Sequence, residues 1–305
     1  MVERFAPSPT GRLHLGHAYS ALTAHDAARA AGGRFLLRLE DLDAGRVRAP
    51  FVEAIVEDLA WLGVLPDGPV WRQSTRARAY DAALHALVAR GLAFRCACTR
   101  RDIQQAVAAP QEGAVQQSPP GAAGDWGLEG PIYPGTCLRR PPAPQATTAW
   151  RLNMGAALAT LGAEPLRFRE IGRGPQGQRG IQTVDPDALR HGAGDIVLAR
   201  KDGAAAYHLA VVVDDAAQGV THVTRGEDLF AATPVHRLLQ ALLGLATPVY
   251  RHHRLVRDDA GRRLAKRDDA RSLESLRAAG ATPASIRANL RLGPPPDTGA
   301  PSAAR

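Results

Sequence analysis

The stretch RFAPSPTGRLHLGH, residues 4–17, lies between a short apolar segment and a long run with helical periodicity. Residues 2–6 read as a buried strand, and residues 15–31 read as a helix that two glycines end. The turn between them gathers unpaired backbone N–H groups at the positive end of the helix, which suits phosphate. His14 and His17 face the same side near the helix start and can donate hydrogen bonds to phosphate oxygens. For the HLGH tetrad alone, a proline-rich connection with two surface histidines is the alternative.

The composition is that of a soluble globular protein. The chain has 305 residues, enough for one large or two modest domains, and 45% of them are apolar and 22% charged. No run approaches the roughly 20 apolar residues that a membrane span needs. The N-terminus MVERFAPSPT lacks the basic-then-apolar layout of a signal peptide. We therefore expect a cytoplasmic protein without a membrane segment, and we expect a monomer.

The basic charge of the chain suggests an anionic partner. The net charge is +8, and nucleic acid is the first candidate, although basic composition alone is weak evidence. Of the 38 basic residues only Lys201 and Lys266 are lysines. Each of the two is therefore a candidate for chemistry that arginine cannot replace.

Strands and helices alternate along the first hundred residues. Strands are expected at 35–41 and 93–98, with helices near 49–62 and 76–90 between them. This alternation indicates a parallel α/β sheet. Residues 104–148 break the pattern with many prolines and glycines, and we interpret them as an insertion between two halves of the sheet domain.

Regular structure is expected to resume after this insertion. The segments 195–203 and 206–216 read as a hairpin-like pair that leads into a buried strand. The expected elements that follow are a strand at 221–228, a helix at 232–244, a strand at 249–255, helices at 272–280 and 283–292, and a disordered end at 294–305.

The longer match RFAPSPTGRLHLGHAYSAL resembles the HIGH signature of class I aminoacyl-tRNA synthetases in its glutamyl form. Its turn reads Pro-Ser-Pro-Thr-Gly at residues 7–11, where glutaminyl enzymes typically carry Pro-Glu-Pro-Asn-Gly. Further matches follow in the family's order: RLEDLD (38–43), WRQSTR (71–76), residues 194–215, residues 221–244, and RLAKR (263–267) in place of the KMSKS loop. The resemblance covers about residues 2–280 and implies an α/β fold with a Rossmann-like parallel sheet and an inserted zinc-binding subdomain.

The resemblance implies a site for ATP. Enzymes of this class join an amino-acid carboxylate to the α-phosphate of ATP, with Mg²⁺, and then pass the acyl group to a hydroxyl. His14, Gly16 and His17 correspond to residues that hold the phosphates at the helix start. Lys266 corresponds to the lysine that grips them from the loop. His14, His17 and Lys266 are therefore the expected catalytic residues.

The resemblance also implies a pocket for glutamate. A glutamate pocket needs arginine for the carboxylates and an acid for the ammonium group. Arg4 and Arg225 match the family's arginines, Glu40 matches its acid, and Tyr207 supplies a wall and a hydroxyl. The floor of the pocket is expected to consist of Phe5, Ala6, Pro7 and Ser8.

Without the family, these polar residues have simpler interpretations. Glu40 can pair with Arg38 or Arg46 on the surface, and Arg225 can cap a strand. Their positions at strand ends favour ligand binding, because α/β sheets bind ligands there. Asp41, Asp43 and Asp228 are expected to be structural or to support the residues that contact the ligand.

The length of the chain separates two members of this group. A full glutamyl-tRNA synthetase continues after its KMSKS loop with a long helical region that binds the anticodon, and this chain stops soon after Lys266. We therefore expect no anticodon-binding domain. This plan is similar to that of the shortened glutamyl-queuosine tRNA(Asp) synthetase family. Enzymes of that family activate glutamate without tRNA and attach it to queuosine, the modified wobble base of tRNA(Asp).

The three cysteines of the chain match the zinc site of the same family. Cys96 and Cys98 are two apart on an expected strand, so that both thiols face one side. Tyr133 and Cys137 follow as a Tyr-x3-Cys pair. The match implies a structural Zn²⁺ that ties the insertion to the sheet. A water molecule in place of the tyrosine, or three unrelated reduced cysteines, are the alternatives.

The implied organisation has a catalytic domain in two halves. Its parts are the first half at 1–95, the zinc-binding insertion at 96–150, the second half at 151–248, the KMSKS-type loop with C-terminal helices at 249–290, and the disordered tail at 291–305.

Two other functions stay open on the sequence. A truncated glutamyl-tRNA synthetase would charge the 3′ end of tRNA(Glu). A catalytically silent paralogue would bind tRNA without chemistry, and only the altered loop favours it, with Arg263 for a lysine and Ala265 for a serine. The complete set of pocket residues argues against a silent protein.

Overall fold

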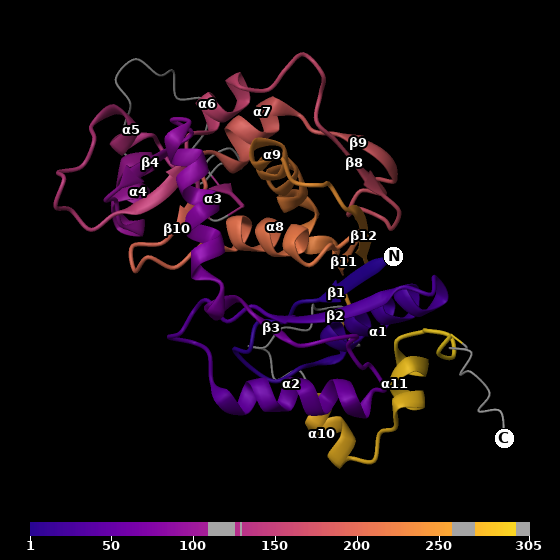
Figure 1. Cartoon of the computed structure of the whole chain (residues 1–305). Helices are drawn as coiled ribbons and strands as arrows, with labels where there is room; N and C mark the ends of the chain where they lie inside the picture. The colour runs from indigo at the N-terminus through magenta and orange to yellow at the C-terminus, as the bar shows by residue number, and fades with distance from the viewer. Residues whose placement is uncertain (109–125, 129, 258–271, 297–305) are drawn as a thin grey trace.

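The centre of the computed structural model, which describes residues 1–108, 126–128, 130–257 and 272–296, is a parallel sheet (Figure 1). Strand β1 (Val2–Phe5) pairs in parallel with β2 (Arg34–Leu39), and β2 pairs in parallel with β3 (Trp71–Arg72). On the other side, β11 (His222–Gly226) pairs in parallel with β12 (Val249–His253). The expected strands at 2–6, 35–41, 221–228 and 249–255 are confirmed, with slightly different ends.

The two groups of strands meet at β1 and β11. The backbone N–H of Thr221 donates to the carbonyl of Val2 at 3.0 Å, and the Thr224 hydroxyl donates to the Glu3 carboxyl at 2.9 Å. Strand β8 (Arg167–Glu170) extends the sheet beyond β12 in parallel, and β9 (Gly180–Thr183) pairs with β8 in the antiparallel direction. The result is the Rossmann-like parallel sheet that the motifs predict.

Helices cover both faces of this sheet (Figure 1). One apolar core includes side chains of α1 (Leu15–Ala30), α2 (Ala49–Trp61), α10 (Leu273–Ala278) and α11 (Pro283–Asn289). The other core includes side chains of α3 (Ala77–Ala89), α8 (Tyr207–Ala217) and α9 (Thr233–Leu243). These helices confirm the expected ones near 15–31, 49–62, 76–90, 232–244, 272–280 and 283–292.

Strand β2 shows how the period of two in a strand prepares the site. Phe35, Leu37 and Leu39 enter the core of α1 and α2, whereas Leu36 enters the opposite core. Arg38 shares the face of Leu36, is fully buried, and meets the two aspartates near the end of α8. The next residue on that face is Glu40, which directly follows β2. Its carboxyl group therefore lies on the face of the sheet where α8 begins, near Tyr207.

Helix α8 contradicts the expectation of a buried strand at 206–216. Seven of the residues of α8 are buried, five of them in the continuous run from His208 to Val212. A helix that is apolar on most sides lacks the alternation of apolar and polar residues that marks an amphipathic helix. The β-branched valines of α8 therefore led to the prediction of a strand. In the structure this segment packs against α3 and α9, and this packing overrides the strand preference of the valines.

Strand β4 (Ala93–Cys96) does not join the parallel sheet, which corrects a second expectation. It pairs antiparallel with β7 (Ala149–Leu152), and β7 pairs antiparallel with β10 (Val197–Ala199). Its partner lies more than fifty residues further along the chain, and such a distant pairing leaves no signal in the local sequence. Cys98 lies just after β4 and not on it.

The insertion is less irregular than expected where it is described. It contains α4 (Arg100–Ala108), the short strands β5 (Trp126–Gly127) and β6 (Gly130–Pro131), and α5 (Thr136–Arg139). Elements that were not expected from the sequence include α6 (Met154–Ala159), α7 (Pro186–Ala188), β3, β7, β8 and β9. Among the described residues, no helix has the length and apolar character to cross a membrane.

The C-terminal helices attach to the HLGH turn. The backbone N–H of Leu273 donates to the carbonyl of Leu13 at 2.8 Å, and Arg12 pairs with Glu274 at 3.0 Å. Lys266, with the altered positions of its loop, lies outside the described residues. The chain re-enters the described structure at Ser272, five residues after the end of the RLAKR segment, and Ser272 forms a β-bridge with His14.

Candidate active site

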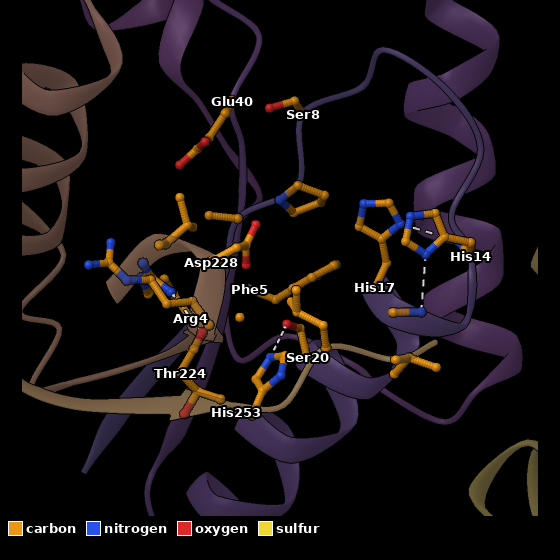
Figure 2. A pocket seen from close by; sticks show the side chains of 18 of the residues that line it. Arg4, Phe5, Ser8, His14, His17, Ser20, Glu40, Thr224, Asp228 and His253 are labelled. Atoms are coloured by element: carbon orange, nitrogen blue, oxygen red, sulfur yellow. Dashed lines mark hydrogen bonds between the residues drawn. The ribbon is translucent and has the colours of Figure 1, made fainter. Parts of the chain in front are cut away.

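A cavity of about 580 Å³ opens where β1, β2, β11 and β12 end (Figure 2). This is the edge at which parallel α/β sheets bind ligands. All the residues expected for glutamate, and those expected for ATP within the described chain, line it: Arg4, Phe5, Ala6, Pro7, Ser8, His14, Gly16, His17, Glu40, Tyr207 and Arg225. In Figure 2 the two histidines lie on one side of the cavity, and Arg4 and Glu40 lie on the other.

The two histidines form a reciprocal cap at the start of α1. His14 Nδ1 accepts a hydrogen bond from the backbone N–H of Gly16 at 3.0 Å, and His17 Nδ1 accepts from the backbone N–H of His14 at 3.2 Å. Because both Nδ1 atoms accept, each neutral imidazole carries its proton on Nε2. The rings, with centroids 3.9 Å apart, are thereby fixed as donors at a positive helix end.

Arg4 is held in the wall of the cavity by a shared carboxylate. Its Nε donates to Asp215 Oδ1 at 3.2 Å, and Arg38 donates to the same oxygen at 2.7 Å. All three side chains are buried. Burial opposes ionisation of Asp215, but the two guanidinium groups hold the pKa of its carboxyl below the usual value. Helix α8 thus anchors Arg4 through its last turn.

Glu40 and Tyr207 close the same end of the cavity. Burial raises the pKa of both side chains, and the nearby arginines oppose the shift at Glu40. Arg38 lies 3.6 Å from Glu40, so the pairing expected as an alternative is present, but it is buried and at the edge of the cavity. The Glu40 carboxyl therefore faces the cavity rather than open surface.

Arg225 is 5% exposed and contributes the second guanidinium. It donates to His252 at 3.1 Å and to Thr233 at 2.8 Å, and it lies 3.1 Å from His236. These contacts come from two elements, β12 and α9, and exceed those of a residue that only caps a strand.

The structure adds cavity residues that the sequence reasoning missed. Asp228, expected to be structural or to support other residues, lines the cavity (Figure 2). Gly226 lines it as well. Ser20 and His253, which lie 2.5 Å apart, line it beneath the histidine turn. The remaining additions are Thr10, Thr224, Leu229, Leu255 and Val256. Only their positions in the sequence could have indicated these residues, because most of them follow the ends of β11 and β12. Asp41, in contrast, is structural as expected and accepts from the backbone and hydroxyl of Ser74.

A second cavity of about 720 Å³ adjoins the first and shares Ser8, Glu40 and Tyr207 with it. It extends toward the insertion, where Cys98 and Tyr133 border it. Its cations outnumber its acids, with Arg46, Arg100, Arg151, Arg200 and Lys201 against Glu40, Asp43 and Asp195.

The three cysteine sulfurs lie within 4.8 Å of one another. Cys98 Sγ lies 3.5 Å from Cys137 Sγ and 3.8 Å from the Tyr133 hydroxyl. In a tetrahedral site with Zn–S bonds of about 2.3 Å, sulfurs lie about 3.8 Å apart, so the cluster has the right size for zinc. Burial raises the pKa of Cys98 to about 12; at Cys137 burial acts the same way, but hydrogen bonds, first from Tyr133, lower the pKa to about 7.

Comparisons with known proteins agree with this geometry. A family model described as the catalytic domain of class I tRNA synthetases (E and Q) matches residues 1–120 and 184–299. The glutamyl-Q tRNA(Asp) synthetase of Rhodobacter capsulatus is 54% identical over 296 residues, which cover 96% of this chain and 100% of the relative. That of Geobacter sulfurreducens is 42% identical over 278 residues, which cover 91% of this chain and 79% of the relative.

A solved structure with lower sequence identity has the same fold. The crystal structure of glutamate-tRNA synthetase from Elizabethkingia anophelis aligns with a TM-score of 0.66 and 28% identity. The alignment covers 88% of this chain and 53% of that one, so this chain spans about half the length of that enzyme. The chain belongs to the class I tRNA synthetases of the E and Q group and, within them, to the glutamyl-Q tRNA(Asp) synthetase family.

Proposed function

We propose that this protein activates glutamate with ATP and transfers it to the queuosine base of tRNA(Asp). The observation that carries the proposal is a single cavity that joins a phosphate-type turn to two buried arginines and an acid. Relatives named glutamyl-Q tRNA(Asp) synthetase, over nearly the full chain, support the acceptor.

In the first step, an oxygen of the glutamate α-carboxylate attacks the α-phosphorus of ATP and pyrophosphate leaves. Arg4 and Arg225 bind the carboxylates, and Glu40 and Tyr207 face the ammonium group. His14 and His17 donate hydrogen bonds from Nε2–H to phosphate oxygens, and Lys266 and an ATP-bound Mg²⁺ would supply positive charge. The chain thus acts mainly by positioning and by neutralising charge.

In the second step, a hydroxyl of the cyclopentene-diol that queuosine carries attacks the activated carbonyl carbon, AMP leaves, and the hydroxyl proton is released. The second cavity supports this step, because it reaches the first at Ser8, Glu40 and Tyr207 and has an excess of cations. Cations along an entry path suit an RNA phosphate backbone.

We also propose that Cys96, Cys98 and Cys137 bind a structural Zn²⁺, with Tyr133 as the fourth ligand. The sulfur distances support this proposal, and thiolates are the preferred ligands of structural zinc. The Tyr133 hydroxyl accepts from the backbone N–H of Cys137 at 2.7 Å, which holds the phenol at the cluster. Bound zinc would fix α5 against the end of β4.

The first test separates the two steps. Purified protein is assayed for glutamate-dependent exchange between ATP and labelled pyrophosphate in the absence of tRNA. Transfer of labelled glutamate is then measured with tRNA(Asp) that carries queuosine, with the same tRNA lacking queuosine, and with tRNA(Glu). A further substrate is queuosine-containing tRNA(Asp) without its 3′-terminal adenosine. Trimming is preferable to periodate, because periodate also cleaves a cis-diol on the base.

We expect exchange without tRNA and transfer to both forms of queuosine-containing tRNA(Asp). Transfer to tRNA(Glu) that is lost on trimming would identify a minimal glutamyl-tRNA synthetase instead. The absence of both exchange and transfer would leave a silent tRNA-binding protein. Each outcome therefore selects one of the three functions.

A further inference from the structure

Arg225 is fixed by three acceptors that carry no charge. Its Nε donates to His252 Nε2 at 3.1 Å, one terminal nitrogen lies 3.1 Å from His236 Nδ1, and the other donates to Thr233 Oγ1 at 2.8 Å. These partners come from β12 and α9 and are at most 2% exposed. A guanidinium has five N–H groups, so among the described residues three are used and two remain for a ligand.

These contacts dictate where the protons lie on the histidines. Arginine only donates, so His252 Nε2 and His236 Nδ1 must both accept. His252 therefore carries its proton on Nδ1, which lies 2.5 Å from Glu170 Oε2. His236 carries its proton on Nε2, which lies 3.0 Å from Nδ1 of buried His208. One arrangement of protons satisfies the whole network.

The carboxylate of Glu170 is itself held in one orientation. Its other oxygen, Oε1, accepts from the backbone N–H of Gly172 at 2.7 Å and from that of His252 at 2.9 Å. A carboxylate behind an imidazole fixes the tautomer and the direction of the ring. Glu170 thereby sets the acceptor that His252 presents to Arg225.

The two arginines of the cavity are held in different ways. Arg4 contacts a carboxylate directly, that of Asp215. Arg225 contacts a hydroxyl and two imidazoles, whose facing nitrogens must accept and therefore carry no proton. Burial lowers the pKa of both histidines, and Glu170 opposes this shift at His252. Neutral acceptors orient a guanidinium without cancelling its charge. Arg225 therefore keeps its attraction for an incoming carboxylate.

We propose that His252 and His236 are positioning residues for Arg225, and that Glu170 acts through His252 by holding its proton on Nδ1. The inference rests on the proposed function, in which Arg225 binds a carboxylate of glutamate. It goes beyond that function by assigning three buried side chains that do not line the cavity.

The variant Glu170→Gln tests the proton arrangement without a change of volume. The two backbone N–H groups keep the amide oxygen at the Oε1 position, so the NH₂ group faces His252 Nδ1 and forces its proton to Nε2, against the Nε–H of Arg225. Loss of a hydrogen bond to a charged group corresponds to a rise of about tenfold or more in the glutamate KM. The ATP KM should not change. His85→Gln, at an exposed position on α3, is the control.

A double-mutant cycle shows whether the effect passes through Arg225. In an Arg225→Lys background, Glu170→Gln should change the glutamate KM by less than about twofold, since a shared interaction is already lost. An equal effect of Glu170→Gln in both backgrounds would overturn the proposal, as would a parallel rise of the ATP KM.

Imidazole nitrogen NMR of the full chain gives a test that needs no activity. The expected spectrum assigns the proton to Nδ1 of His252 and to Nε2 of His236 near pH 7, with the signals identified by His252→Gln and His236→Gln. The opposite tautomer of His252, or a charged ring, would overturn the proposal. If the wild-type protein shows no glutamate-dependent exchange, the proposed function fails and the tautomers still decide the arrangement.

Discussion

Replacing Asp215 by asparagine removes one negative charge from between two buried arginines. Oδ1 of Asp215 accepts from Arg38 at 2.7 Å and from Arg4 at 3.2 Å, and Arg38 is fully buried. The other carboxylates near Arg38 are those of Glu40 and Asp214, at 3.6 and 3.8 Å. They are too distant to replace two hydrogen-bonded contacts. Asp215→Asn keeps the shape and the oxygen but leaves the core with an extra positive charge.

The expected loss in the free energy of unfolding is about 3 kcal/mol. Hydrogen bonds to charged groups contribute about 1.5–3 kcal/mol and neutral ones about 1 kcal/mol, and two such bonds change from charged to neutral on the acceptor side. Breaking a buried ion pair costs a similar amount, about 3–5 kcal/mol. Because Arg4 and Arg38 lower the folded-state pKa of Asp215, the wild-type advantage should be full at pH 7 and shrink only below about pH 4.

Urea unfolding at pH 7 measures this loss directly. The matched control is Asp202→Asn, which makes the same change in the exposed pair of Arg200 and Asp202. Exposed pairs contribute about 0–1 kcal/mol, so the control should stay close to wild type. The reasoning is refuted if the two variants lose the same free energy of unfolding while the slope of that free energy against urea concentration equals that of wild type. The glutamate KM of Asp215→Asn should also rise, because Arg4 loses its anchor.

Three further outcomes follow from other sites. Burial raises the pKa of Asp58 to about 6, and its oxygens have no hydrogen-bond partner in the described chain. The folded state therefore binds this proton more tightly than the unfolded state. The free energy of unfolding gained by Asp58→Asn, measured with urea, should be about 1 kcal/mol larger at pH 7 than at pH 5. Equal gains at the two pH values would contradict this. In Gly16→Ala the new Cβ would lie 2.9 Å from His14 Cε1 and displace the His14 ring, so the rate of pyrophosphate exchange should fall about tenfold. The control Gly162→Ala, where an added Cβ meets no atom within 4 Å, should keep the wild-type rate. Cys98→Ser should lower the zinc content measured by elemental analysis and the Tm; retained zinc would argue against the cluster.

The cavity could be predicted from the sequence because its residues belong to local motifs at strand ends. The turn at 4–17 contains the residues that determine its backbone conformation: prolines before the helix and a glycine two residues after His14. Arg4, Glu40 and Arg225 stand at or near the ends of separate strands. A parallel sheet brings such ends to one edge whatever the details of packing. The family resemblance identified these residues, and the topology of the sheet explains why their side chains meet in one cavity.

The environment of these residues could not be predicted in the same way. Glu170, His252 and His236 come from β8, β12 and α9, and nothing in their local sequences relates them to Arg225. The helix α8 was mistaken for a strand because burial on most sides removes the helical pattern of polar residues. That error hid the role of Asp215, which reaches Arg4 only from the last turn of a helix.

The two anchors of the cavity differ in what their removal leaves behind. Loss of the charge at Asp215 leaves Arg38 and Arg4 buried with less compensation, so stability and glutamate binding should fall together. Loss of the charge at Glu170 leaves a neutral imidazole whose Nε2–H faces the Nε–H of Arg225, so one buried hydrogen bond is lost but no buried charge loses its counter-charge. Stability should therefore fall by less than in Asp215→Asn, while glutamate binding falls. A plot of glutamate KM against unfolding free energy for Asp215→Asn and Glu170→Gln should therefore separate them. If both variants lose stability in proportion to affinity, the imidazoles around Arg225 only support the fold, and the distinction between a charged and a neutral anchor is wrong.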